Sequence, residues 1–415
     1  MPCPVLSRRS RAVMAVALGL ASSRGALAQE PVTRPARTAA SRAALGRELR
    51  DTLRVILDRA RADSAFPGAW VVVGTHSGVL AELGAGTIDW KRSPKPTSRT
   101  IWDLASLTKV VATTSAVMQL VEQGKLDLDA RVQHYLPEWT GDGKERVTVR
   151  DLIMHRSGLP PFKAFPYDID ADSTRKLFLS VPLDTAPGVR MVYSDIGFVL
   201  LAEVVRHVSG ERIDAYVLRH VYRPLGMSDT RYNPPRSWLA RVAPTETEAF
   251  RGGQVRGVVH DERAWRMDGV AGHAGLFSSG RDLARFCLMY MNKGQLAGVR
   301  VFKSKTVEMF TAYQDSSWSN RALGWQKPEL AGMKFTGPSA AWGGHGASAA
   351  SIGHTGFTGT SLYMDFGHDV FVVLLTNRVN PTREHSRITP VRNQVADAVL
   401  AVLARFDSTP SSPRQ

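Results

Sequence analysis

The tetrapeptide Ser106-Leu107-Thr108-Lys109 opens a run of apolar residues with helical spacing. A spacing of three places the Ser106 hydroxyl and the Lys109 amine one turn apart on one face of a helix. An amine in this position activates a serine as a nucleophile, either as the base itself or by organising another base nearby. Ser-x-x-Lys alone arises by chance in many proteins, so its interpretation depends on the motifs that follow.

Two further motifs follow the tetrapeptide along the chain. Tyr193-Ser194-Asp195 stands directly before an apolar stretch that has the length of a helix, and His354-Thr355-Gly356 lies among short apolar segments. A hydroxyl, an amine, a phenol and an imidazole in a fixed order are typical of nucleophilic catalysis rather than of packing alone.

Strand patterns occur near both ends of the chain and helical patterns between them. The predicted strands are residues 69–73, 79–83, 350–353, 360–365 and 370–376. The predicted helices are residues 43–63, 196–208, 213–222 and 392–403, with a further helix that Ser106 opens and Gly124 ends. That further helix carries Leu107, Val110, Val111, Thr114, Met118 and Val121 on one apolar stripe. This order predicts an α+β fold whose sheet is assembled from the two ends of the chain.

The three motifs and their flanks resemble the serine β-lactamase and penicillin-binding protein superfamily, most closely its class C and DD-peptidase branch. The resemblance covers residues 51–403, nearly the whole chain. Its flanking segments are Leu152-Ile153-Met154-His155-Arg156-Ser157-Gly158-Leu159-Pro160, Pro224-Leu225-Gly226-Met227 and Gly353-His354-Thr355-Gly356-Phe357-Thr358-Gly359. The resemblance implies an antiparallel sheet flanked by helices, an inserted, mostly helical lobe at about residues 126–264, and a site in the crevice between them.

The resemblance implies a catalytic role for three residues. Ser106 is expected to be the nucleophile that forms an acyl-enzyme. Lys109 has apolar neighbours, and since burial disfavours a charged amine, we expect a lowered pKa that lets Lys109 take the serine proton or tune another base. Tyr193 is expected to be the second base or acid, provided that a nearby cation favours its ionised form.

Five more residues are expected to bind substrate. Asp195 stands where the family commonly has Asn, so we expect it either to bind a substrate amide or to orient Lys109, although a carboxylate can only accept hydrogen bonds. His354 replaces the family's usual Lys; as an imidazolium it would grip a substrate carboxylate and lose that grip as the pH rises through about 6–7. Thr355 can bond either a substrate carboxylate or the Tyr193 side chain, and Gly356 permits close approach of a substrate that lies along the strand edge. By the resemblance, Phe357 supplies an oxyanion N–H beside that of Ser106.

Composition and motifs exclude several other classes of function. The formal charge is +15, but Lys and Arg are scattered rather than clustered with aromatic residues, which argues against a nucleic-acid partner. The eleven histidines form no metal-binding motif, no nucleotide loop precedes a helix, and no Gly-x-Ser-x-Gly elbow is present. We therefore expect no metal and no cofactor. His260-Asp261 and Gly272-His273-Ala274-Gly275 are interpreted as structural or rim residues.

The ends of the chain predict export. A basic stretch, Arg8-Arg9-Ser10-Arg11, precedes a short apolar run and the small-residue site Ala26-Leu27-Ala28. This is the pattern of a signal peptide over residues 1–28, cleaved near Ala28, and not of a membrane span. A flexible lead (29–40), a hydrolase domain (41–405) and a disordered tail (406–415) are expected to follow. The mature protein is expected to be periplasmic or secreted.

Three substrate classes stay open from the sequence: peptidoglycan-type peptides that end in D-Ala-D-Ala, β-lactams, and small esters. A D-alanyl-D-alanine carboxypeptidase-like activity ranks first, because a histidine at position 354 suits the peptidase and esterase branches. The alternatives are a carboxylesterase and a catalytically silent protein that binds cell wall.

Overall fold

The strands that the sequence places at the two ends of the chain form one sheet. The computed structural model describes residues 38–91, 93–164, 166, 169–334 and 342–408. The proposed signal peptide, most of the lead and the last residues of the tail lie outside this range. Helix α1 (Ala39–Ala62) begins slightly before the predicted domain, and helix α11 (Ile388–Ser408) continues slightly beyond it.

A five-stranded sheet with the order β10-β11-β12-β1-β2 organises the fold, and every neighbouring pair is antiparallel. Its strands are β1 (Gly68–Thr75), β2 (Gly78–Gly86), β10 (Ser351–Thr355), β11 (Ser361–Asp365) and β12 (Val370–Thr376). The central pair joins β1 to β12, so the first and last strands of the chain lie side by side. The predicted α+β class and the assembly of the sheet from both ends are thereby confirmed.

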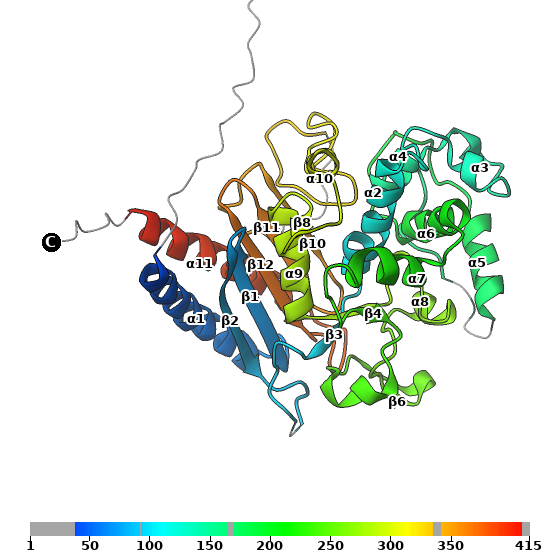
Figure 1. Cartoon of the computed structure of the whole chain (residues 1–415). Helices are drawn as coiled ribbons and strands as arrows, with labels where there is room; N and C mark the ends of the chain where they lie inside the picture. The colour runs from blue at the N-terminus through cyan, green and yellow to red at the C-terminus, as the bar shows by residue number, and fades with distance from the viewer. Residues whose placement is uncertain (1–37, 92, 165, 167–168, 335–341, 409–415) are drawn as a thin grey trace, which may run out of the picture. The chain divides into compact units, whose positions relative to one another are not determined.

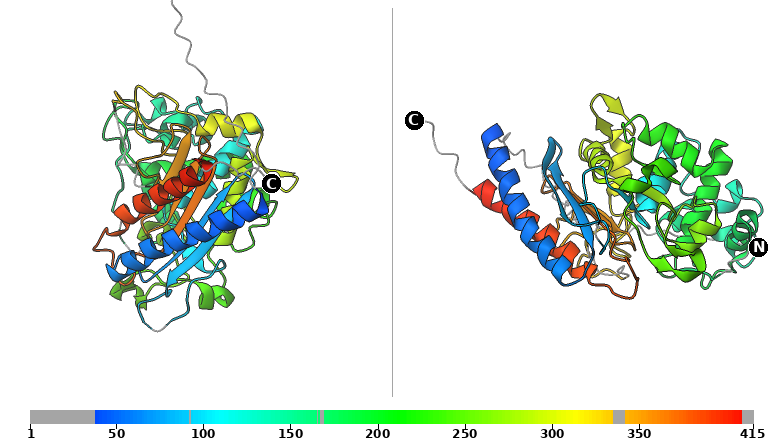
Figure 2. Two further views of the ribbon diagram at one scale, coloured as in Figure 1. Left: turned by 90° about the vertical axis from the view of Figure 1, so that its left-hand side faces the viewer. Right: turned by 90° about the horizontal axis from the view of Figure 1, so that it is seen from below.

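Helices α1 and α11 cover one face of this sheet, where they lie side by side across the strands (Figures 1 and 2). The leucines of α1 recur every four residues, at Leu45, Leu49, Leu53 and Leu57, and all four are buried. They pack with Val71, Val73 and other residues of the sheet and α11 in one apolar cluster. Each fully buried leucine contributes roughly 1.5–3 kcal/mol, which fixes this layer.

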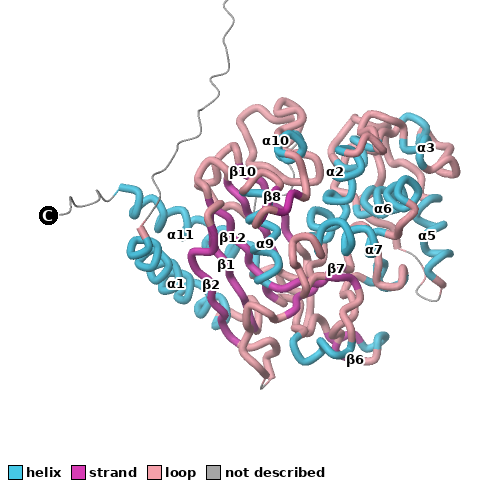
Figure 3. Tube along the Cα trace, in the orientation of Figure 1, coloured by secondary structure: helices cyan, strands magenta, loops and turns pink. Residues whose placement is uncertain are grey.

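The opposite face carries helix α9 (Gly280–Met291) and, beyond it, the inserted lobe (Figure 3). Cys287 of α9 is a buried free thiol. The other helices are α3 (Val132–Tyr135), α4 (Val149–Ile153), α5 (Ala171–Ser180), α6 (Asp195–Ser209), α7 (Ile213–Val217), α8 (Glu262–Arg266) and α10 (Ser304–Thr311). A small sheet, β3 (Ile101–Asp103), β7 (Leu276–Ser279) and β4 (Arg231–Tyr232), borders them. Two two-stranded sheets complete the list: β5 (Thr247–Glu248) with β6 (Gly253–Gln254), and β8 (Gln295–Leu296) with β9 (Val299–Arg300).

The helix that follows Ser106 differs from the prediction. It is π-helical over Lys109–Thr114 and becomes α-helix α2 only at Ser115–Glu122. The predicted single apolar stripe is wrong, because every residue from Leu107 to Met118 is buried. π-Helical turns are rare and occur often at functional sites. In the part of the chain that the structure describes, no helix is long and apolar enough to cross a membrane.

Candidate active site

Ser106 lies in the turn between β3 and the helix that follows, and a buried carboxylate shapes this turn. The Asp103 side chain accepts hydrogen bonds from the backbone N–H groups of Ala105 and His260, at 2.9 and 2.7 Å. Ala105 has a φ of +46°, a left-handed conformation that non-glycine residues rarely adopt. Such backbone strain persists only where the surroundings enforce it and is common at active sites. The turn directs Ser106 into a cavity of about 260 Å³.

Lys109 is fully buried and lies against Ser106. Its Nζ donates to Ser106 Oγ at 3.0 Å, to the Asp195 carboxylate at 2.7 Å and to the backbone carbonyl of His273 at 3.4 Å. The predicted lowering of its pKa is wrong. Burial does lower the pKa, but the adjacent Asp195 carboxylate and the Tyr193 side chain outweigh burial, so the pKa of Lys109 is raised. Lys109 is therefore a permanent cation beside the nucleophile and has no free lone pair to accept the serine proton.

Asp195 is the first residue of helix α6, where Ser194 caps the helix by accepting from the Gly197 N–H. Arg263 approaches the second carboxylate oxygen of Asp195 at 3.4 Å. Burial raises the pKa of this carboxyl, but the charges of Lys109, His273 and Arg263 reverse that effect and lower it overall. Of the two roles that the sequence leaves open, the contacts favour orientation of Lys109.

Tyr193 is held in place by the segment that begins at helix α4. The Nδ1 of His155 accepts the Ser194 backbone N–H at 3.0 Å, and its ring packs on that of Tyr193 with centroids 4.5 Å apart. Lys109 Nζ lies 4.8 Å from the centre of the Tyr193 ring. The Tyr193 ring thus lies against Lys109, and its side chain lines the same cavity as Ser106.

His354 lies near the end of β10 and cannot carry the charge that the sequence predicts for it. Its side chain is buried, and Nδ1 is within 2.9 Å of the Thr355 carbonyl oxygen. Burial and the positive charges of Lys109 and Arg321 hold the pKa of His354 well below its usual value. In the free protein this imidazole is therefore held neutral near pH 7, which does not favour the expected imidazolium grip on a carboxylate.

The turn after β10 brings Phe357 close to the Ser106 segment. Thr360 Oγ1 donates to the Leu104 carbonyl at 3.1 Å, and Thr358 Oγ1 donates to the Asp103 carbonyl at 2.7 Å. A Cβ on Gly356 would lie 2.4 Å from the Leu104 oxygen, so glycine is needed here for contact with the protein's own backbone. The backbone N–H groups of Ser106 and Phe357 donate to none of the described residues. Two free N–H groups at one cavity wall suit an oxyanion.

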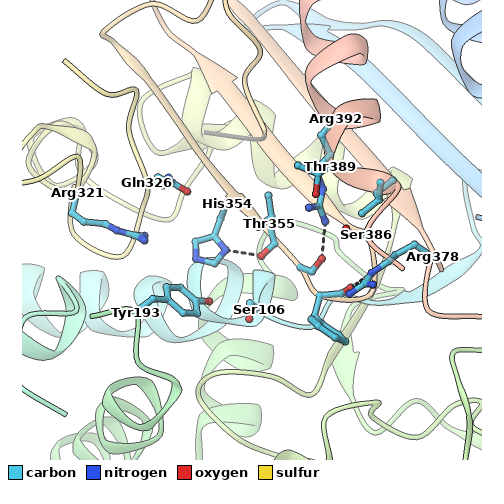
Figure 4. A pocket seen from close by; sticks show the side chains of 13 residues that line it. Ser106, Tyr193, Arg321, Gln326, His354, Thr355, Arg378, Ser386, Thr389 and Arg392 are labelled. Carbon is cyan, nitrogen blue, oxygen red and sulfur yellow. Dashed lines mark hydrogen bonds between the residues drawn. The ribbon is translucent and has the colours of Figure 1, made fainter. Parts of the chain in front are cut away.

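The cavity is lined by residues from five parts of the chain: Ser106, Tyr193, and members of the segments 321–326, 354–357 and 378–392 (Figure 4). All the residues that the sequence singles out line it except Lys109 and Asp195, which lie behind Ser106 and Tyr193. The remaining lining residues are Arg321, Gln326, Arg378, Ser386, Ile388, Thr389 and Arg392.

Comparison with known proteins identifies the family. The family model described as Beta-lactamase matches residues 53–397. The chain belongs to the beta-lactamase family. An N-acetylmuramyl-L-alanine amidase of Bacillus subtilis is 35% identical over 350 residues, 76% of this chain and 78% of the relative. A putative D-alanyl-D-alanine carboxypeptidase of Escherichia coli is 33% identical over 323 residues, 71% and 72% of the two chains.

Solved structures of this family share the fold. A penicillin-binding protein homologue from Caulobacter crescentus superposes with a TM-score of 0.67 at 19% identity, over 86% of this chain and 97% of the other. A class C beta-lactamase superposes with a TM-score of 0.66 at 20% identity, over 85% and 96%. The resemblance that the three motifs indicate, and the fold that it implies, are thereby confirmed.

Sequence reasoning about this beta-lactamase family member missed several residues of the site. Asp103 and His155 position Ser106 and Tyr193, and Arg321 lines the cavity. His155 belongs to the quoted flank Leu152 to Pro160, so that motif could have indicated it. Asp103 and Arg321 belong to no motif. Their place in the site becomes visible only in the structure, from the hydrogen bonds of Asp103 and from the position of Arg321 on the cavity wall.

Among the described residues, two clusters of carboxylates and histidines resemble sets of metal ligands, but an arginine already contacts the carboxylates of each cluster. The first cluster is Asp195, Asp261 and His273, and the second is Glu246, Glu248 and His260. Arg263 approaches both aspartates of the first cluster, and Arg383 bonds both glutamates of the second. We interpret both as ion-pair networks that support the site. They agree with the structural or rim role expected of the His260-Asp261 and Gly272 to Gly275 segments.

The neutral state of His354 leads to a test by kinetics. Since its pKa lies well below 6.5, the charge of His354 does not change between pH 6.5 and 8. We expect the KM for a carboxylate-bearing substrate to vary less than about twofold over this range, both in the wild type and in His354→Gln. If the KM of the wild type rises about tenfold between pH 6.5 and 8 while the KM of His354→Gln stays constant, the imidazole of His354 is charged at the lower pH.

Proposed function

We propose that this chain is an exported serine hydrolase that cleaves an amide bond in peptidoglycan-type peptides through an acyl-enzyme on Ser106. One observation carries the proposal: a fully buried Lys109, held charged by Asp195, donates to Ser106 Oγ at 3.0 Å beside Tyr193 in an open cavity. The export element of the proposal rests on the signal-peptide pattern of residues 1–28.

In the acylation step, Ser106 Oγ attacks the substrate carbonyl carbon and gives up its proton. Lys109 already carries its full set of protons, so Tyr193, acting in its ionised phenolate form beside the Lys109 cation, is the group on this wall that is left to accept the proton. The new C–O bond forms, and negative charge passes to the carbonyl oxygen. The N–H groups of Ser106 and Phe357 stabilise that charge.

Collapse of the tetrahedral intermediate breaks the C–N bond and releases the amine, which takes the proton from Tyr193. A water molecule then attacks the ester carbonyl, gives a proton to Tyr193, and displaces Ser106 Oγ, which recovers that proton. The products are an amine and a carboxylic acid, and the enzyme returns to its starting state. The charge of Lys109 stays fixed through the cycle and holds both oxygens in position.

The named relatives support peptidoglycan-type substrates, and they differ in the bond that their names imply. The carboxypeptidase name implies release of a terminal D-alanine, and the amidase name implies cleavage between the muramyl group and L-alanine. We rank D-alanyl-D-alanine-type cleavage first. Cleavage at the muramyl amide is the second candidate. The Bacillus amidase supports it, because the match to this chain is 35% identical and spans 78% of the amidase.

A comparison of four substrates at equal concentration tests this ranking. The set is a diacyl-D-Ala-D-Ala peptide, N-acetylmuramyl-L-alanine, nitrocefin and p-nitrophenyl butyrate. We expect the highest kcat/KM on the D-Ala-D-Ala peptide, with D-alanine as the released product. Fast release of L-alanine with no D-alanine would replace the first candidate by the second.

Rapid nitrocefin or ester turnover without cleavage of either amide would overturn the peptidoglycan assignment. A protein that turns over none of the four substrates but is retained on peptidoglycan would instead be the silent wall-binding protein. The rate measured with Ser106→Ala gives the background for every substrate.

A further inference from the structure

An arginine of helix α11 bonds the peptide group that carries the Phe357 N–H. Arg392 reaches from α11 toward the end of β10 (Figure 4), and its Nη2 donates to the Gly356 carbonyl at 2.7 Å. This carbonyl and the Phe357 N–H belong to one planar peptide unit, in which the C=O and N–H bonds point in opposite directions. A donor that holds the Gly356 oxygen therefore also holds the direction of the Phe357 N–H.

The two carbonyls that Arg392 bonds already have backbone partners. The Gly356 oxygen accepts the Gly359 N–H at 3.0 Å. The Thr360 oxygen, which lies 3.0 Å from Arg392 Nη2, accepts the Gly356 N–H at 2.8 Å. The turn thus closes on itself through its own backbone, and the guanidinium is not needed to satisfy these carbonyls.

Burial of Arg392 is unfavourable for the fold. The residue is 8% exposed, and within the described part of the chain its Nε has no hydrogen-bond partner. Burial and the nearby charge of Arg378 lower the pKa of Arg392 to about 9, so the guanidinium keeps its charge near neutral pH. A buried charge whose partners are neutral destabilises a protein relative to an apolar side chain of similar size. A structural role alone therefore does not explain Arg392.

A cation on the carbonyl side of a peptide makes its N–H a better donor. Charge-assisted hydrogen bonds are shorter and stronger than neutral ones, and hydrogen bonds in series polarise one another in a protein interior. Arg392, the Gly356–Phe357 peptide and an oxyanion would form such a series. Since the Phe357 N–H donates to none of the described residues, its polarity is available to a bound oxygen.

Arg378 secures the next peptide along the turn. Its Nε donates to the Phe357 carbonyl at 2.7 Å, and its central carbon lies 4.3 Å from the centre of the Phe357 ring. Arg378 also bonds the carbonyls of Arg383 and His385. Arg378 thus fixes the place of Phe357, whereas Arg392 bonds the peptide group to which the N–H belongs.

We infer that Arg392 is a positioning residue of the oxyanion site, which orients and polarises the Phe357 N–H through their shared peptide bond rather than by contact with the substrate. This inference rests on the proposed function and deepens it. Negative charge develops on the carbonyl oxygen only as the reaction proceeds, so the contribution of Arg392 belongs to kcat rather than to KM.

Kinetics on two substrates test this role: the diacyl-D-Ala-D-Ala peptide, which ends in a carboxylate, and p-nitrophenyl butyrate, which has none. We expect Arg392→Met to lower kcat about 100-fold on both, with KM changed by less than about threefold. Arg392→Lys keeps the charge and should recover part of the loss, whereas the neutral donor of Arg392→Gln should recover less. A loss confined to the peptide, or a change in KM alone, would overturn the inference, since Arg392 would then bind the substrate itself.

Arg256 provides a matched control. Its Nε and Nη2 bond the carbonyls of Val242 and Ala240 at 2.8 and 3.3 Å, and it does not line the cavity. We expect Arg256→Met to keep kcat within a few-fold of the wild-type value. Because the turn after β10 closes on itself, the melting temperature of Arg392→Met should fall by no more than about 3 °C. A larger fall, with no recovery of kcat in Arg392→Lys, would assign Arg392 to the scaffold.

Nuclear magnetic resonance of the Phe357 N–H keeps the test independent of turnover. In protein with isotope-labelled phenylalanine, the Phe357 amide proton should move upfield in Arg392→Met and stay in place in Arg256→Met, because a less polarised N–H has a more shielded proton. If the wild type hydrolyses neither substrate but this shift occurs, the proposed function fails and the positioning role stands. If the resonance is the same in the wild type and Arg392→Met, the inference fails whatever the turnover.

Discussion

Ser106→Ala is expected to lower kcat on the preferred substrate by about 10⁵- to 10⁶-fold, the largest effect of any substitution in this chain. The hydroxyl supplies the attacking oxygen, and no neighbouring side chain can replace it. The free energy of unfolding should change by less than about 1 kcal/mol, since Lys109 keeps its bonds to Asp195 and the His273 carbonyl. Steady-state kinetics and thermal unfolding measure the two effects.

Ser115→Ala is the matched control for this substitution. Ser115 is buried in the same helix, but its hydroxyl bonds the Val110 carbonyl and does not line the cavity. The kcat of Ser115→Ala should stay within a few-fold of the wild-type value. Residual activity of Ser106→Ala above about one part in a thousand would show that Ser106 is not the nucleophile.

Lys109→Met is expected to lower both activity and stability, and the two losses can be separated. We expect kcat to fall by about 10³-fold or more, because Ser106 and Tyr193 lose the cation that orders them. The free energy of unfolding should fall by about 3 kcal/mol, since Asp195 is left in a largely buried position without its main partner.

The double variant Lys109→Met/Asp195→Asn provides the control for that loss. It removes the unpaired carboxylate and should recover most of the stability but none of the activity. Chemical denaturation and single-turnover kinetics on the wild type, Lys109→Met, Asp195→Asn and the double variant complete a double-mutant cycle. If the double variant recovers activity together with stability, Lys109 is only a structural partner of Asp195.

The sequence predicts the elements of this fold well wherever a local pattern decides them. The alternation and turn at residues 69–83 predict β1 and β2, and the leucine spacing from Leu45 predicts α1. The motifs at Ser106, Tyr193 and His354 predict the family together with their flanking segments, because so many short motifs do not occur in one order by chance.

The charge states of the site could not be predicted in the same way. Burial of Lys109 is visible in its apolar neighbours, but the Asp195 carboxylate that reverses the effect of burial comes from another helix. Burial, together with the positive charges of Lys109 and Arg321, lowers the pKa of His354, and none of these effects is local in the sequence. The π-helical turns after Lys109 also escape prediction, since the same apolar residues suit an α-helix.

Mass spectrometry of the enzyme during turnover tests the central claim most directly. The protein is mixed with the diacyl-D-Ala-D-Ala peptide or with benzylpenicillin, quenched in acid within milliseconds to seconds, and digested. The account predicts an increase in mass equal to the acyl group on the fragment that contains Ser106, decaying as water hydrolyses the ester and absent from Ser106→Ala. Turnover with no adduct at any quench time, or an adduct on a different residue, would contradict it.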